Sequence, residues 1–171
     1  MKYLQNKKHL PLIGVGPIIV LPQLILTITG IVLSSKGIII NYHFDILKIP
    51  FTIIGVLLIL YAILLWYAAN FKTKIDKHIE NNKLATQGVY SIVRNPIYSA
   101  FFILCIGLIF IENNLILFII LIICWLYMTI ILINTEEKWL YNLYGKEYID
   151  YCKKVNRCIP SRIKKVKNLQ E

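Results

Sequence analysis

Four long stretches of the chain contain no Lys, Arg, Asp or Glu, and they divide it into apolar and polar parts. The stretches cover residues 9–35, 49–71, 95–111 and 113–135. A helix of roughly 20 apolar residues crosses a bilayer core about 30 Å thick. The pattern therefore predicts an all-α integral membrane protein with four transmembrane helices, at about residues 10–34, 49–71, 96–112 and 114–135.

The first and third stretches depart from the simplest form of this pattern. The first contains Pro17 and Pro22, so we expect either one kinked helix or a helix broken in two, which would give five membrane helices. Its long apolar region, with no small-x-small cleavage site after it, does not fit a secretory signal peptide. The third begins at Asn95-Pro96, which predicts an N-cap followed by the first helical residue.

The basic residues indicate the orientation of these helices. Both termini and the loop 72–95 together carry 17 of the 19 Lys and Arg residues, and the loop after the first stretch carries the other 2. Since basic residues favour the cytoplasmic side, both termini and the 72–95 loop are predicted to be cytoplasmic.

Composition excludes several classes of protein. With 57% hydrophobic and 16% charged residues, the chain does not fit an ordinary soluble domain. The net charge of +10 is explained by topology and by attraction to anionic headgroups, so no nucleic-acid partner is expected. Four cysteines and three histidines show no ligand spacing, and neither a metal site nor a disulfide is expected. No internal repeat is visible, so residues 1–171 are predicted to form a single membrane domain.

A polar segment at residues 82–98 leads from the second cytoplasmic loop into the third apolar stretch. Gly88 permits a tight turn. Beyond it, the start of the third helix offers backbone N–H groups beside Arg94, Tyr90 and Tyr98, which suits an anionic or polar ligand. The same residues also fit a simple interfacial anchor, because Tyr and Arg often lie at headgroup level.

A second polar segment begins at Glu136 and Glu137, directly after the fourth apolar stretch. Carboxylates at the membrane boundary are costly unless they are hydrogen-bonded or paired with a cation. Downstream, apolar residues at roughly helical spacing predict an amphipathic helical segment, about residues 136–160, at the cytoplasmic surface of the bilayer. A tight turn at 112–114 places the two polar segments side by side, an arrangement that suits a zwitterionic or cationic nucleotide-like molecule.

Residues 84–98, LATQGVYSIVRNPIY, resemble the signature L-x-T-x-G-x-Y-x-x-x-R-[HN]-P-x-Y of integral-membrane methyltransferases. This superfamily contains the isoprenylcysteine carboxyl methyltransferases and the phospholipid methyltransferases. The glutamate pair and residues 144–160 resemble the family's C-terminal block. The resemblance therefore covers about residues 82–160, whereas the first two apolar stretches match only as generic membrane helices.

The resemblance implies methyl transfer from S-adenosylmethionine, at the cytoplasmic membrane face, to a lipophilic acceptor. That acceptor would be an isoprenylcysteine carboxylate, a phospholipid amine, or a related small lipid or thiol, and S-adenosylhomocysteine would be the product. The implied cofactor contacts are Asn82, Lys83, Leu84, Ala85, Tyr90, Asn95, Pro96, Ile97, Tyr98 and Glu136.

Arg94 and Glu137 are the candidate catalytic residues, for positioning the acceptor or handling a proton. A structural ion pair between Arg94 and a glutamate is the alternative. Many family members have His where this chain has Asn95, and Asn cannot act as a titrating base. In the isoprenylcysteine branch, an Arg implicated in the acceptor site takes the position of Leu132, which weighs against a carboxyl acceptor here.

Two other functions remain open at this point. A sterol- or lipid-reductase-like membrane enzyme has a similar C-terminal half and would bind NADPH, although this chain is small for that class. A non-enzymatic four-helix membrane protein, such as a small transporter, would need ionisable residues within its spans. The four apolar stretches contain no Asp, Glu, Lys or Arg.

Overall fold

The computed structural model describes residues 15–40, 42–72 and 84–160, and the regular elements in these ranges are all helices. The longer ones are α1 (Gly16–Ser35), α2 (Lys48–Tyr67), α4 (Pro96–Glu112), α5 (Phe118–Leu132), α6 (Lys138–Tyr144) and α7 (Lys146–Lys154). Short 3₁₀ helices lie at Asp45–Leu47, Gly88–Ser91 and Leu115–Leu117, and π-helical turns lie at Ala68–Lys72 and Ile133–Glu137.

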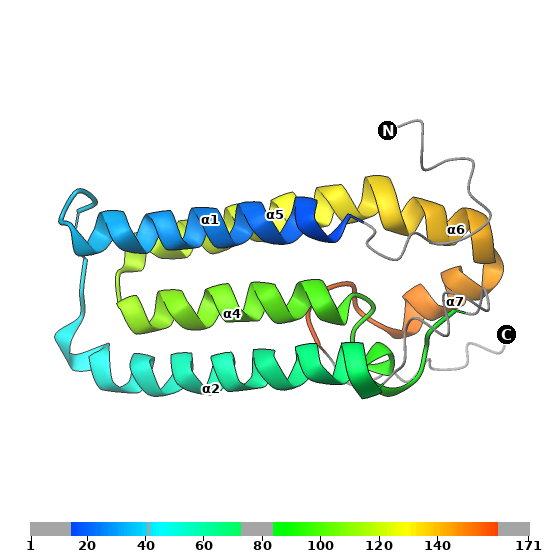
Figure 1. Cartoon of the computed structure of the whole chain (residues 1–171), viewed down its shortest axis with the longest axis horizontal. Coiled ribbons are helices and arrows are strands. Elements are labelled where there is room, and N and C mark those ends of the chain that lie inside the picture. The colour runs from blue at the N-terminus through cyan, green and yellow to red at the C-terminus, as the bar shows by residue number, and fades with distance from the viewer. Residues whose placement is uncertain (1–14, 41, 73–83, 161–171) are drawn as a thin grey trace, which may run out of the picture.

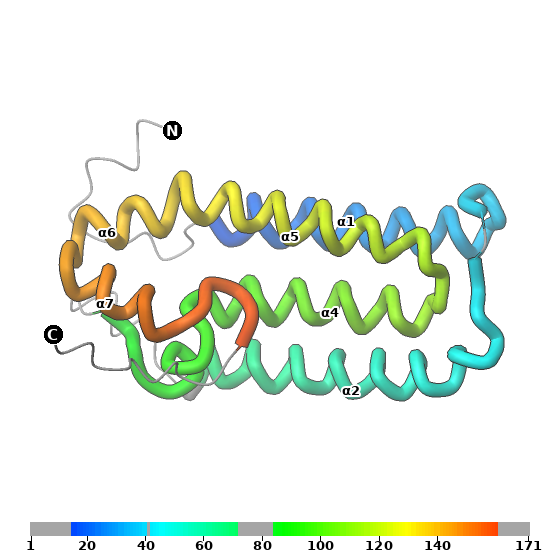
Figure 2. Tube along the Cα trace, turned by 180° about the vertical axis from the view of Figure 1, so that it is seen from behind, coloured from blue at the N-terminus to red at the C-terminus, as the bar shows by residue number. Residues whose placement is uncertain are grey.

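The predicted all-α membrane architecture is confirmed. Three helical segments are long and apolar enough to cross a bilayer, namely Gly16–Ser35, Asp45–Phe71 and Leu115–Tyr144, and α4 is a shorter apolar helix of 17 residues. The four long helices run alongside one another, with α4 between α2 and the α1–α5 pair (Figures 1 and 2). The short helices α6 and α7 fold over the end of the bundle at which α1 and α4 begin (Figure 2).

The first apolar stretch forms one helix, because α1 continues through Pro22. A proline in a helix leaves the carbonyl four residues earlier without its usual N–H donor. Here that carbonyl belongs to Ile18, and the hydroxyl of Tyr127 on α5 donates a hydrogen bond to it at 2.7 Å. In a membrane such a replacement donor is valuable since no water is present. Within the described part of the first stretch, from residue 15 onwards, the helix is therefore not broken at Pro22.

The α2–α4 pair is held at close range by two glycines. A Cβ atom added to Gly55 would lie 2.6 Å from the carbonyl oxygen of Gly107, and one added to Gly107 would lie 2.8 Å from the carbonyl oxygen of Gly55. Small residues of this kind let membrane helices bring their backbones together. This pairing fixes α4, and therefore the start of α4, against α2.

The far end of the bundle is closed by Asn113 and Asn114. Asn113 takes a left-handed conformation with φ 58°, and its side chain donates to the carbonyl of Phe44 at 3.1 Å. The fully buried Asn114 side chain donates to Ser34 Oγ at 3.0 Å and to the carbonyl of Ile40 at 3.3 Å. These bonds tie the α4–α5 turn to the α1–α2 connection, so α4 and α5 form the predicted hairpin.

The C-terminal segment is two helices, which meet at Gly145 with φ +51°. Its apolar residues Tyr148, Tyr151 and Val155 are buried against one another and against Leu84 and other protein side chains. The segment is therefore helical with one apolar side, as predicted. Its apolar face, however, packs mainly on the protein, because the sharp turn at Gly145 folds α7 back over the bundle.

Candidate functional site

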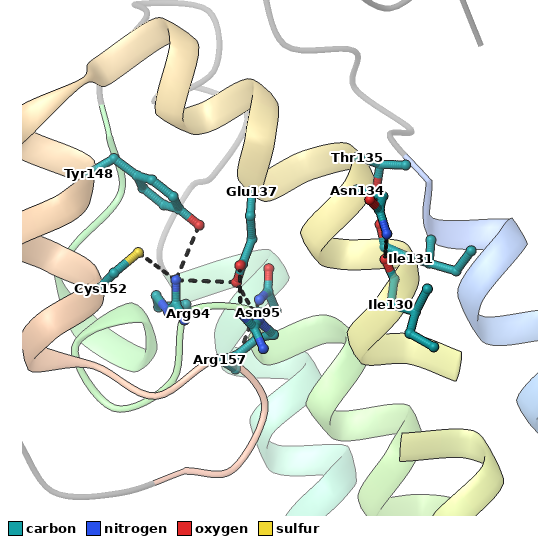
Figure 3. A network of polar contacts seen from close by, with 10 residues as sticks. All are labelled: Arg94, Asn95, Ile130, Ile131, Asn134, Thr135, Glu137, Tyr148, Cys152 and Arg157. Atoms are coloured by element: carbon teal, nitrogen blue, oxygen red, sulfur yellow. Dashed lines mark hydrogen bonds and ion pairs between the residues drawn. The ribbon is translucent and has the colours of Figure 1, made fainter. Parts of the chain in front are cut away.

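The site is built around a π-helical turn, Ile133–Glu137, that continues α5. The side chains of Asn134 and Thr135 donate to the carbonyls of Ile130 and Ile131, four residues earlier, at 2.8 and 2.6 Å (Figure 3). Such back-bonding competes with the regular helical bonds. A π turn adds a residue to the turn and is often found at functional sites. It sets the direction of Glu136 and Glu137 at the end of the turn.

Glu136 joins the starts of two other helices. Its Oε1 atom accepts hydrogen bonds from the Tyr98 hydroxyl at 2.5 Å and from the backbone N–H of Val15 at 3.2 Å. Tyr98 lies in the first turn of α4, and Val15 directly precedes α1. The other oxygen, Oε2, has no partner among the described residues.

Glu137 instead faces two arginines. Arg157 forms two parallel hydrogen bonds to it, from Nε to Oε1 at 2.7 Å and from Nη2 to Oε2 at 2.8 Å. Arg94 Nη1 lies 3.2 Å from Oε1 of the same carboxylate (Figure 3). The side chains of Arg94, Glu137 and Arg157 are 10%, 12% and 28% exposed. We call these three residues the arginine–glutamate cluster.

Arg94 is also held by α7. Its Nη1 atom donates to the hydroxyl of Tyr148 at 3.3 Å and to the sulfur of Cys152, and its guanidinium carbon lies 5.9 Å from the centre of the Tyr148 ring (Figure 3). Burial raises the pKa of the Tyr148 hydroxyl and that of the Cys152 thiol, so both groups are neutral at neutral pH. The Nε atom of Arg94 is buried without a partner.

The C-terminal tail pairs with the loop before α4 in a strand-like manner. The backbone N–H of Arg94 donates to the carbonyl of Asn156 at 2.9 Å, and the N–H of Asn95 donates to that of Arg157 at 3.1 Å. The Tyr151 hydroxyl donates to the carbonyl of Tyr90 at 2.5 Å. The backbone N–H groups of Arg94 and Asn95, directly before α4, are therefore already used by the tail.

The helix start at Asn95-Pro96 is positioned as predicted, but the role of the Asn95 side chain is different. α4 begins at Pro96, and Asn95 occupies the N-cap position without a capping hydrogen bond from its side chain. Its Nδ2 atom donates to the carbonyl of Arg157 at 3.1 Å instead (Figure 3).

Four of the remaining predicted contacts lie among the described residues, before α4 and at its start. Asn82 and Lys83 lie outside the described residues. Leu84 packs on the Tyr148–Tyr151–Val155 cluster, and Ala85 is buried. Pro96 is fully buried and Ile97 half-buried at the start of α4.

Sequence reasoning did not select Arg157, Tyr148 or Cys152 as site residues, although all three contact the arginine–glutamate cluster or belong to it. For Arg157 a signal did exist. A carboxylate at a membrane boundary needs a cation, and Arg157 stands within the C-terminal block that follows the glutamates. Only the reversal of the chain at Gly145 brings Arg157 back to Glu137, and spacing alone does not reveal that reversal.

Comparisons with known proteins agree with this arrangement. Residues 46–147 match the family model for phospholipid methyltransferases. Over 82 residues, the chain is 32% identical to protein-S-isoprenylcysteine O-methyltransferase B of Arabidopsis thaliana, which covers 47% of this chain and 41% of that relative. The match thus spans less than half of the relative's length. No solved structure matches the chain significantly. The family match covers more than half of the chain and includes Arg94 and both glutamates, so the chain belongs to the phospholipid methyltransferase family.

Proposed function

We propose that this protein is an S-adenosylmethionine-dependent methyltransferase that acts at the cytoplasmic face of a membrane on a lipophilic acceptor. One observation carries the proposal. The two polar segments, 38 or more residues apart, meet at one end of the helix bundle through the Tyr98–Glu136 hydrogen bond and the Arg94–Glu137 ion pair. Membership of the phospholipid methyltransferase family favours methyl transfer over a lipid reductase or a non-enzymatic membrane protein.

The residues at this end fit the proposed cofactor. When bound, S-adenosylmethionine supplies a methyl group on a sulfonium, which is already activated for displacement. Glu136 keeps Oε2 without a partner among the described residues, and this oxygen suits an ammonium or ribose hydroxyls. The aromatic rings of Tyr90 and Tyr98 suit an adenine or a cationic sulfur.

We assign Glu137 a positioning role. Its carboxylate receives the parallel pair of bonds from Arg157 and an ion pair from Arg94. Both carboxylate oxygens of Glu137 are thus occupied by the two arginines, which suits a residue that holds Arg94 in place. An amine or thiol acceptor would have to lose its proton elsewhere, whereas a carboxylate acceptor needs no base.

A lipophilic acceptor suits the surroundings of the site. An apolar pocket of about 290 Å³ lies between α2 and α4, lined by Ala62, Ile63, Trp66, Ala100, Phe101 and Leu104. Ala100 is four residues beyond the start of α4, so the pocket lies near the same end of the bundle as the site. All six lining side chains are apolar or, for Trp66, mostly apolar, and they offer room for part of a hydrocarbon chain.

The cytoplasmic location rests on charge. The segments at the site end of the bundle belong to the 72–95 loop and the C-terminal region, which hold most of the basic residues. An excess of Lys and Arg favours the cytoplasmic side. Access to a soluble cofactor from the cytoplasm and to a lipid from the bilayer is the functional consequence.

Binding of S-adenosylhomocysteine to the detergent-purified protein, measured by calorimetry, tests the proposal together with transfer of a labelled methyl group to total lipid extract. Glu136→Gln is expected to weaken binding at least about tenfold, because it removes a charged acceptor. Glu112→Gln, at the other end of α4, is the matched control and is expected to bind normally. Equal binding by the wild type and Glu136→Gln, without labelled product, would overturn the proposed function.

A further inference from the structure

The arginine–glutamate cluster carries more positive than negative charge. It contains two guanidinium groups and one carboxylate, and the described residues place no second acidic side chain in an ion pair with either arginine. Arg94 is nine-tenths buried, and Glu137 is nearly so. A net charge held away from water is unfavourable unless a counter-ion reaches it.

The neighbours of the cluster do not supply the missing charge. Tyr148 and Cys152 contact Arg94, and both are neutral at neutral pH since burial raises their pKa values. They orient the guanidinium without balancing it.

Both arginines still have donors to offer. Arg94 Nε is buried and unpartnered. Arg157 turns Nε and Nη2 towards Glu137, so its Nη1 has no partner among the described residues. Its side chain is 28% exposed, which leaves a path for a ligand. A guanidinium has five N–H donors in a planar fork, which matches a carboxylate or a phosphate.

Glu136 gives the site a second side of opposite charge. It is the residue directly before Glu137, yet its contacts are with Tyr98 and Val15 rather than with the arginines. Two consecutive residues thus face different sides, one with the carboxyl group of Glu136 and no arginine in contact with it, and one with a net positive charge. A ligand that carries both an ammonium and an anionic oxygen group complements this arrangement.

We propose that Arg94 and Arg157 together bind an anionic oxygen group, a carboxylate or a phosphodiester, of a ligand of the methyltransferase site. Glu137 holds the two guanidinium groups in a common orientation for it. The inference rests on the proposed function, and it adds Arg157 as a binding residue. The anionic group comes either from the amino-acid end of the cofactor or from the acceptor.

Two substitutions with opposite expected effects test this. Arg157→Gln removes one donor of the anion site and is expected to weaken binding of the anionic ligand about tenfold. Glu137→Gln removes the competing negative charge but keeps an amide oxygen that can accept from both guanidinium groups, as Oε1 of Glu137 does. The arginines are then still held in place, so the anion is expected to bind equally well or more tightly. If Arg157 only anchors Glu137, both substitutions break the same pair and weaken binding alike, which would overturn the proposal. Lys153→Gln on α7, with a 65% exposed side chain, is the control for loss of one positive charge.

The two sources of the anion are separated by the choice of probe. 5′-Methylthioadenosine lacks the amino-acid end of S-adenosylhomocysteine. The dissociation constant of 5′-methylthioadenosine divided by that of S-adenosylhomocysteine therefore measures the contribution of that end, and any general loss of folded protein cancels in this ratio. A fall of this ratio in Arg157→Gln identifies the cofactor carboxylate. An unchanged ratio with a raised KM for N-acetyl-S-farnesylcysteine or phosphatidylethanolamine identifies the acceptor.

Failure of the inference and failure of the proposed function are distinguishable. If wild-type protein binds S-adenosylhomocysteine, and Arg157→Gln changes neither the ratio nor a KM, the inference alone is overturned. If wild-type protein binds neither S-adenosylhomocysteine nor 5′-methylthioadenosine and transfers no methyl group, both are overturned.

Discussion

The hydroxyl of Tyr98 donates a 2.5 Å hydrogen bond to Oε1 of Glu136, across 38 residues of sequence. The same oxygen accepts from the backbone of Val15, so a single carboxylate holds together the starts of α1 and α4 and the end of α5. The three helices are thereby fixed at the end that carries the proposed site.

Removal of the Tyr98 hydroxyl should weaken this junction. Tyr98→Phe leaves Glu136 with one hydrogen-bond donor fewer in a largely buried place, a loss of about 1–3 kcal/mol. The expected result is a lower midpoint of thermal unfolding in detergent. Tyr61→Phe on the lipid-facing side of α2, where Tyr61 is 42% exposed, is the matched control. A midpoint unchanged in Tyr98→Phe would show that the bond contributes nothing to stability.

The close approach of α2 and α4 gives a second prediction. In Gly107→Ala the new methyl group would lie 2.8 Å from the carbonyl oxygen of Gly55, so the helices must separate. Overpacking of this kind costs about 1–3 kcal/mol. Stability is read from the unfolding midpoint in SDS–detergent mixtures. Gly16→Ala, whose Cβ would meet the Tyr98 ring at an ordinary 3.8 Å, is the control and should change the midpoint less.

The thiol of Cys158 should be unreactive in the folded protein. Burial raises its pKa to about 12, and the side chain is 4% exposed. Since the thiolate is the reactive form, only about one molecule in 10,000 carries it at pH 8. Labelling of Cys158 by iodoacetamide, followed by mass spectrometry, should therefore be slow at pH 8 and faster as the pH rises towards 10.

Protein unfolded in SDS supplies the control for this labelling, because there Cys158 should react like an ordinary thiol. The raised pKa of Cys158 also determines how its contribution to folding stability changes with pH. A raised folded-state pKa favours the neutral thiol, so its contribution to stability is complete below the unfolded pKa of about 8.5 and is lost as the pH rises through about 12. Rapid labelling of Cys158 in folded protein at pH 8 would contradict its burial against α1, α4 and α5.

Much of the helical architecture is readable from the sequence because it depends on one variable, the length of uncharged segments. α4 begins at Pro96 as predicted, whereas α1 begins at Gly16, later than the predicted start at about residue 10. The tight turn at 112–114 was enough to place Arg94 and the glutamates at the same end of the bundle. The partition of Glu136 and Glu137 between different partners was not readable, because it depends on the π turn at 133–137. Arg157 was missed since its position depends on the chain reversal at Gly145.

Of the two alternatives left open for the first span, α1 takes the continuous form at Pro22, and the reason gives the last prediction. Pro22 leaves the Ile18 carbonyl without a helical donor, and the Tyr127 hydroxyl donates to it at 2.7 Å from the neighbouring α5. Tyr127→Phe should therefore cost about 1 kcal/mol of stability, because the carbonyl faces an environment without water.

The size of this effect should depend on Pro22. In Pro22→Ala the backbone N–H of residue 22 becomes available to the Ile18 carbonyl, so the Tyr127 hydroxyl is no longer needed. Tyr127→Phe is expected to destabilise the wild-type protein and to have little effect in the Pro22→Ala background. Unfolding midpoints of the two single variants and the double variant form a cycle that measures this coupling. If Tyr127→Phe has the same effect in both backgrounds, the hydroxyl does not replace the donor that Pro22 lacks, and the continuity of α1 needs another cause.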